Sequence, residues 1–155
     1  DEDKGFYTKK NLSEEEIKFL LNKGYVISSH VPLGGGRQDY YLLKPSTRES
    51  NGHFFLVRAL EEYLLSFTKY VKLYETNKPD IIFIAGRKKI AIEIETGVLL
   101  KDKPRMDEKI KALNKYYDDW FFVVVHSDLA YSYCKLGKTF TRKNVCRQIR
   151  RYFKK

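Results

Sequence analysis

Three acidic residues near the middle of the chain have the spacing of a cation site. Glu93 and Glu95 stand two residues apart in a mostly apolar run that is typical of a β-strand. Side chains two residues apart lie on the same face of a strand. Asp80 opens the preceding β-like run, and a tight turn at 86–88 separates the two runs. If these strands pair about that turn, the three carboxylates lie close together.

Carboxylates that converge need a counter-charge, because they repel one another and lose hydration. Hard oxygen ligands suit Mg²⁺ or Mn²⁺, and such an ion can lower the pKa of a bound water and stabilise charge on a phosphate. We therefore expect a Mg²⁺ or Mn²⁺ site at Asp80, Glu93 and Glu95. The alternative is that Glu93 and Glu95 form the solvent-facing side of an amphipathic edge strand.

The segments around these acids alternate between helical and β-like patterns. They predict an α/β (α+β) fold with a mixed central sheet flanked by helices. The almost wholly apolar run at 120–125 predicts a strand that is buried on both faces. The predicted elements are a helix at 52–66, strands at 70–75, 80–85 and 89–96, a helix at 105–118, the strand at 120–125, and one or two closing helices at 129–136 and 141–154.

The first fifty residues form a separate unit in this interpretation. Ser13 and Glu16 have the spacing of a capping box and predict a helix at 13–23, and two β-like runs at 25–31 and 38–43 flank three consecutive glycines. A helix followed by a hairpin resembles the second half of a winged-helix unit; a surface hairpin without function is the alternative. The polar connector at 44–52 then predicts an appendage at 1–50 and a core at 51–155 that ends in a basic helix.

The charge of the chain favours a polyanionic partner. Its 155 residues carry a formal net charge of +10, which favours nucleic acid or a membrane surface and does not choose between them. We expect DNA as the partner. No apolar run is long enough to span a bilayer and the start does not resemble a signal peptide, so a soluble cytoplasmic protein without a membrane partner is expected. The candidate DNA contacts are Arg37, His53, Arg147, Arg150 and Arg151.

The motif Pro79-Asp80 followed by Glu93-Ile94-Glu95, in α-β-β-β-α-β order, resembles the PD-(D/E)XK (restriction-endonuclease-like) nuclease superfamily. It is similar to branches found in archaeal and mobile-element proteins. The resemblance implies that Asp80 and Glu93 are metal ligands and that the carbonyl of Ile94 is a third. It also implies that the first core helix contributes His53 or Glu61, which share one helical face.

One residue departs from the superfamily pattern, because Glu95 occupies the position of the usual catalytic lysine. This lysine can move to a neighbouring element, and Lys109 on the next helix is the candidate; an exposed charge without a role is the alternative. The resemblance implies a metal-dependent DNA endonuclease, acting as a homodimer or in a larger complex. The alternative is an inactive nuclease-fold module that binds DNA in a replication, conjugation or transposition assembly. The candidate catalytic residues are Asp80, Glu93, Glu95, Lys109 and Glu61.

Overall fold

The N-terminal unit is a small antiparallel sheet with one helix. In the computed structural model, which describes residues 5–46, 48–74 and 78–154, its strands lie in the order β1-β3-β2. The predicted capping box is present, because Ser13 and Glu16 each accept a hydrogen bond from the other's backbone N–H. The elements are β1 (Phe6–Thr8), the 3₁₀ turn η1 (Lys9–Asn11), α1 (Glu14–Asn22), β2 (Val26–His30) and β3 (Asp39–Leu43).

Residues from 51 onward form the predicted mixed sheet. Its strand order is β4-β5-β6-β7-β8; neighbours are antiparallel from β4 to β6 and parallel from β6 to β8. The observed elements are α2 (Asn51–Leu65), β4 (Val71–Leu73), β5 (Ile81–Ala85), β6 (Lys88–Glu95), η2 (Val98–Lys101), α3 (Lys103–Tyr116), β7 (Asp119–Val124), η3 (Ser127–Leu129), α4 (Ala130–Cys134), β8 (Thr139–Phe140) and α5 (Val145–Tyr152). The α-β-β-β-α-β order is thus confirmed, although α5 starts later than the predicted helix at 141–154.

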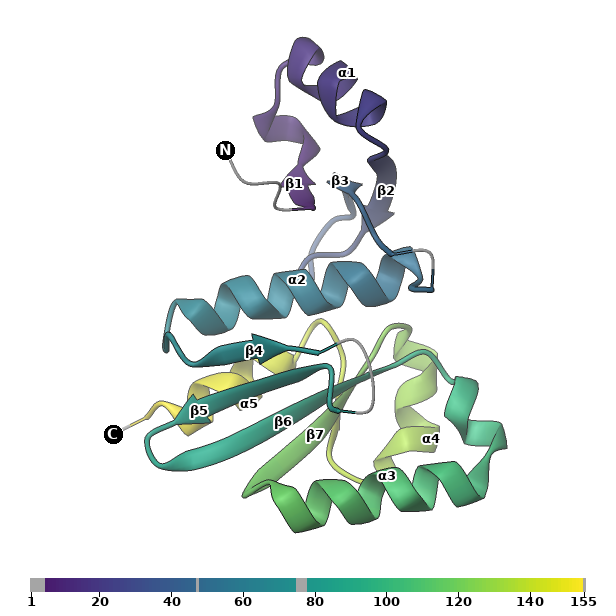
Figure 1. Ribbon diagram of the computed structural model, residues 1–155, viewed down its shortest axis with the longest axis vertical. Helices are drawn as coiled ribbons and strands as arrows, with labels where there is room; N and C mark the ends of the chain where they lie inside the picture. Colours follow the sequence, from purple (N-terminus) through teal and green to yellow (C-terminus); the bar gives the residue numbers. More distant parts are fainter. Residues whose placement is uncertain (1–4, 47, 75–77, 155) are drawn as a thin grey trace.

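Helices cover both faces of this sheet. Helix α2 lies between the N-terminal sheet and the five-stranded sheet (Figure 1), and it buries Leu56, Leu60 and Leu64 completely. Helix α5 adds Val145 and Ile149 to the same core. The opposite face carries α3 and α4, which pack against residues of β7 in a second core. The five-stranded sheet thus lies between two helical layers.

Strand β7 is buried on both faces, as its apolar sequence predicted. Phe121 and Val123 belong to the core under α2, whereas Phe122 and Val124 belong to the core under α3. All four side chains are at most 1% exposed. Strand β7 pairs in parallel with β6. This pairing positions the end of β6 between the two helical layers.

The N-terminal sheet is attached to this core by packing and by hydrogen bonds. Tyr41 and Leu43 of β3 share the buried cluster with Phe55 of α2. The loop after β2 contacts the segment before α5, because the Gly34 N–H donates to the Arg142 carbonyl at 2.8 Å and the Arg142 guanidinium donates to the Val31 carbonyl at 3.2 Å. The hairpin that follows α1 is therefore held against the core at its loop.

No helix in the described residues has both the length and the apolar character needed to cross a bilayer.

The start of α2 depends on close contact between its backbone and Val125, the residue that follows β7. A Cβ added at Gly52 would lie 2.6 Å from Val125 Cγ1, so Gly52→Ala should push α2 away from the sheet. We expect this change to lower the free energy of unfolding by about 1–3 kcal/mol, although helix propensity alone predicts a gain of about 1 kcal/mol. Urea denaturation checks this. Asn51→Ala, at the exposed neighbouring position, is the control and should change stability by less than about 0.5 kcal/mol; a more stable Gly52→Ala protein would contradict the packing.

Candidate active site

Two buried glutamates form the centre of the site. Glu93 and Glu95 lie at the end of β6 and are only 4% and 5% exposed. Ile92, which precedes Glu93, and Ile94, which lies between the two glutamates, pack into the core under α2. Strand alternation therefore turns both glutamates toward α3. The prediction that Glu93 and Glu95 share one face is confirmed, and that face is buried rather than solvent-facing.

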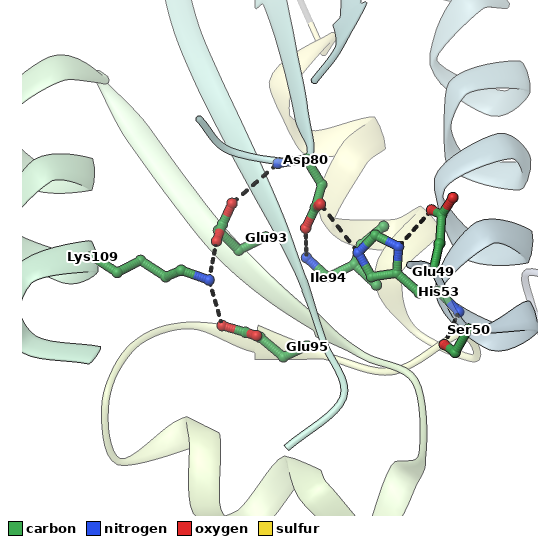
Figure 2. A network of polar contacts seen from close by, with 8 residues as sticks. All are labelled: Glu49, Ser50, His53, Asp80, Glu93, Ile94, Glu95 and Lys109. Atoms are coloured by element: carbon green, nitrogen blue, oxygen red, sulfur yellow. Dashed lines mark hydrogen bonds and ion pairs between the residues drawn. The ribbon is translucent and has the colours of Figure 1, made fainter. Parts of the chain in front are cut away.

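Lys109 lies between the two glutamates. Its ammonium nitrogen is 2.5 Å from Glu93 Oε2 and 3.2 Å from Glu95 Oε1 (Figure 2). Helix α3 places it there, because Met106 and Leu113 on the same side of the helix are buried against the sheet. The Asp102 side chain accepts the Arg105 N–H and so caps the start of α3. Lys109 is thus not an exposed charge without a role.

This cluster holds more negative charge than Lys109 can neutralise. Burial raises the pKa of Glu93 to about 7, and the nearby Asp80 and Glu95 charges add to the effect while Lys109 opposes it. Burial also raises the pKa of Glu95, again against Lys109. Burial alone would lower the pKa of Lys109, but the two carboxylates raise it. A further cation at this place would be stabilised by the same charges.

Asp80 connects this cluster to the other face of β6. It directly precedes β5 and lies opposite Glu93, because Ile81 pairs with Ile92. Its backbone N–H donates to Glu93 Oε1 at 3.1 Å, and its own carboxylate accepts the Ile94 N–H at 2.9 Å. The Asp80 backbone therefore faces Glu93, whereas its carboxylate is held by β6 on the side of α2.

His53 holds the second oxygen of Asp80. Its Nε2 lies 3.1 Å from Asp80 Oδ1 and its Nδ1 lies 2.7 Å from Glu49 Oε1 (Figure 2). Ser50 positions this residue, because its hydroxyl accepts the His53 backbone N–H at the start of α2. Burial alone would lower the pKa of His53, but the hydrogen bonds to Asp80 and Glu49 raise it to about 10. His53 is therefore an imidazolium that donates to both carboxylates.

The remaining residues predicted for the site lie elsewhere. Glu61 pairs with Arg58 at 3.2 Å on α2 and contacts none of the acids above. Arg37 is exposed in the loop between β2 and β3, and Arg147 and Arg151 are exposed on α5. Arg150 donates to the Tyr63 hydroxyl, which is about 15 Å along α2 from His53 at 1.5 Å per residue. The structure thus brings together Asp80, Glu93, Glu95, Lys109 and His53, but not Glu61 or these arginines.

Other basic residues lie nearer to the site than those predicted. A cleft of about 1830 Å³ contains His53 and Asp80 and is lined by Arg48, Arg142 and Lys143. No local pattern marks Arg142, because its partner Val31 is 111 residues away in sequence. For Arg48, the signal in the sequence for a place near the site is its position in the polar connector before α2.

The side chains fit a divalent cation in chemistry, although they are not arranged as a finished site. Within the described ranges, no three His, Cys, Asp or Glu side chains surround a common point. The carboxylates of Glu93 and Glu95 meet at Lys109, while that of Asp80 is turned toward His53. Asp80 and Glu93 still offer hard oxygen donors on facing strands.

Comparisons with models of protein families, with curated proteins and with solved structures find no match to this chain.

The raised pKa of Glu93 predicts a pH-dependent stability in the absence of metal. The native state binds this proton more tightly than the unfolded chain, whose glutamate has the ordinary pKa of 4.5. The contribution of this bound proton to the free energy of unfolding is therefore complete below about pH 4.5. It is lost as the pH rises to about 7, which lowers the free energy of unfolding by roughly 3 kcal/mol at most. Glu93→Gln should remove this loss and gain stability relative to the parent over that range.

Urea denaturation in buffers with a chelator, repeated from pH 4.5 to 8, measures this difference. Glu108→Gln, an exposed substitution on α3, is the matched control and should follow the parent at every pH. Parallel curves for the parent and Glu93→Gln would contradict a pKa of Glu93 that burial raises.

Proposed function

We propose that this protein is a metal-dependent nuclease that hydrolyses DNA phosphodiester bonds. The observation that carries the proposal is the position of Lys109, within hydrogen-bonding distance of both Glu93 and Glu95. In the PD-(D/E)XK pattern, the position of Glu95 would hold a lysine. Here an ammonium group reaches Glu93 from α3 instead of from β6, and in this proposal Lys109 takes the place of that lysine.

Asp80 and Glu93 are the residues that would hold the metal in this proposal, together with the carbonyl of Ile94. A bound Mg²⁺ or Mn²⁺ would supply an activated water and neutralise charge on the scissile phosphate. The protein's own groups prepare the site: His53 orients Asp80 through its Oδ1, and the Ile94 N–H holds its Oδ2. Glu95 holds Lys109, whose ammonium can donate to a phosphate oxygen beside Glu93.

The alternative function is DNA binding without cleavage, as a module within a larger DNA-processing assembly. One observation favours it: both oxygens of Asp80 already have partners, the His53 ring and the Ile94 N–H. Metal binding at Asp80 must share or replace these partners. Under this alternative His53 and Lys109 are permanent counter-charges that stabilise the fold, and no hydrolysis occurs.

Substitution of Lys109 tests the proposal. Lys109→Met should reduce cleavage by about 10²-fold or more, because it removes a preorganised cation from the developing charge on the phosphate. The assay incubates supercoiled and linear DNA with Mg²⁺, Mn²⁺ or a chelator. Lys111→Met, an exposed lysine on the same helix, is the control and should cleave like the parent.

One further variant makes this assay decisive. Asp80→Asn should lose cleavage and bind Mn²⁺ more weakly, because one of the two anionic donors is gone. Thermal unfolding of each variant shows whether it is folded at the assay temperature. Cleavage by the parent with the chelator present, or equal cleavage by Lys109→Met and the parent, would remove the basis for the proposal. Binding without cleavage under every metal condition would favour the alternative.

A further inference from the structure

The cleft beside Asp80 is large enough for a segment of a polymer. Its volume of about 1830 Å³ exceeds the roughly 300–1,000 Å³ that are typical of small-molecule sites. Its walls come from the loop between β2 and β3, the first turns of α2, the residues that follow β7, and the segment at 141–143. The cleft therefore runs along the junction between the N-terminal sheet and the core, with Asp80 and His53 inside it.

The charge of the cleft is uneven. Among the residues that the structure describes, three acidic residues line the cleft, and two of them, Glu49 and Asp80, are bridged by the His53 imidazolium. The third is Asp128, which is exposed at its border. The basic residues that line the same cleft are Lys44, Arg48, Arg58, Arg142 and Lys143. Away from Asp80, the lining is thus predominantly positive.

Arg142 is the least ordinary of these basic residues. Its side chain is half-buried. Its guanidinium donates to the Val31 carbonyl at 3.2 Å and lies 5.4 Å from the Phe55 ring centroid. Among the described residues no carboxylate pairs with it. Burial lowers the pKa of Arg142, as expected for a desolvated cation without an anion. A half-buried charge of this kind is costly unless a ligand supplies the counter-charge.

We propose that Arg142, Lys143 and Arg48 form a phosphate-binding site that guides the backbone of the DNA strand through this cleft toward Asp80. The inference rests on the proposed function, because it assigns the path of the same substrate. A guanidinium has five N–H donors in a planar fork that matches phosphate oxygens. The bond to Val31 and the stacking on Phe55 fix the orientation of this fork and leave donors for a phosphate.

This path differs from the one that the C-terminal arginines would give. Arg147 and Arg151 are exposed on α5 and do not line the cleft. The neighbouring Arg150 is bound to Tyr63, far along α2 from His53. The two regions therefore offer a matched comparison, in which the same charge is removed either from the cleft or from α5.

The experiment measures DNA binding with a chelator present, so that cleavage does not interfere. Fluorescence anisotropy follows a labelled single-stranded oligonucleotide and the duplex of the same sequence. The test protein carries Arg48→Gln and Lys143→Gln, and the control carries Arg147→Gln and Arg151→Gln. Both proteins lose two exposed positive charges and have equal net charge.

We expect the cleft variant to bind at least one of the two oligonucleotides roughly tenfold more weakly or worse. Its slope of log affinity against log salt should fall by about one for each lost phosphate contact. The α5 variant should stay close to the parent in both measurements. The form of DNA that shows the loss, single strand or duplex, is the form that enters the cleft.

Arg142 itself is tested by Arg142→Gln and Arg142→Lys. The first should weaken binding more than any other single change, and the second should restore part of it. If Arg142→Gln fails to fold, the variant with exposed substitutions at Arg48 and Lys143 decides.

Equal loss in the cleft and α5 variants, a larger loss in the α5 variant, or no binding of either oligonucleotide by the parent would overturn the inference. A protein that binds through the cleft but never cleaves DNA would keep this inference and lose the proposed function. A protein that cleaves DNA while the cleft variant binds normally would do the reverse.

Discussion

The site depends on the contact of one ammonium group with two buried carboxylates. Lys109 lies between Glu93 and Glu95 at 2.5 and 3.2 Å, and without it both carboxylates would be buried with no direct counter-charge, at a cost of several kcal/mol. The contact requires β6 to present alternate residues to α3 and requires α3 to pack with Met106 against the sheet. Strand β7, beside β6, supplies the apolar surface on which that helix lies. The second core of the molecule therefore holds α3 in the position from which Lys109 contacts both glutamates.

A second constraint acts from the other face of β6. Asp80 is held there by the Ile94 N–H and by the His53 imidazolium, and His53 is in turn held by Glu49 and by the cap of α2. The two halves meet through the bond from the Asp80 N–H to Glu93. The site is thus assembled at the ends of two strands by the first turns of two helices, and the cleft is lined by Asp80 and His53.

Much of this arrangement could be predicted from sequence because it follows from short-range rules. Glu93 and Glu95 share a face because strands alternate, and Ser13 and Glu16 cap a helix because of their spacing. Lys109 could be proposed because a helix had to follow β6. The short strands β1 and β8 were not predicted, since two or three residues carry no periodicity and only their partner strands define them. Two hydrogen bonds join residues that are distant in sequence: one between Arg142 and Val31, and one between His53 and Asp80. No local pattern could predict these two bonds.

The central claim is that Lys109 performs on α3 the task that a lysine at position 95 performs in the PD-(D/E)XK pattern. A rescue experiment tests it most directly, by measuring the cleavage rate of Lys109→Met alone and in combination with Glu95→Lys. We expect the single variant to lose cleavage by about 10²-fold or more and the double variant to regain it, because an ammonium again lies beside Glu93. A single variant that cleaves like the parent, or a folded double variant with no recovered activity, would contradict it.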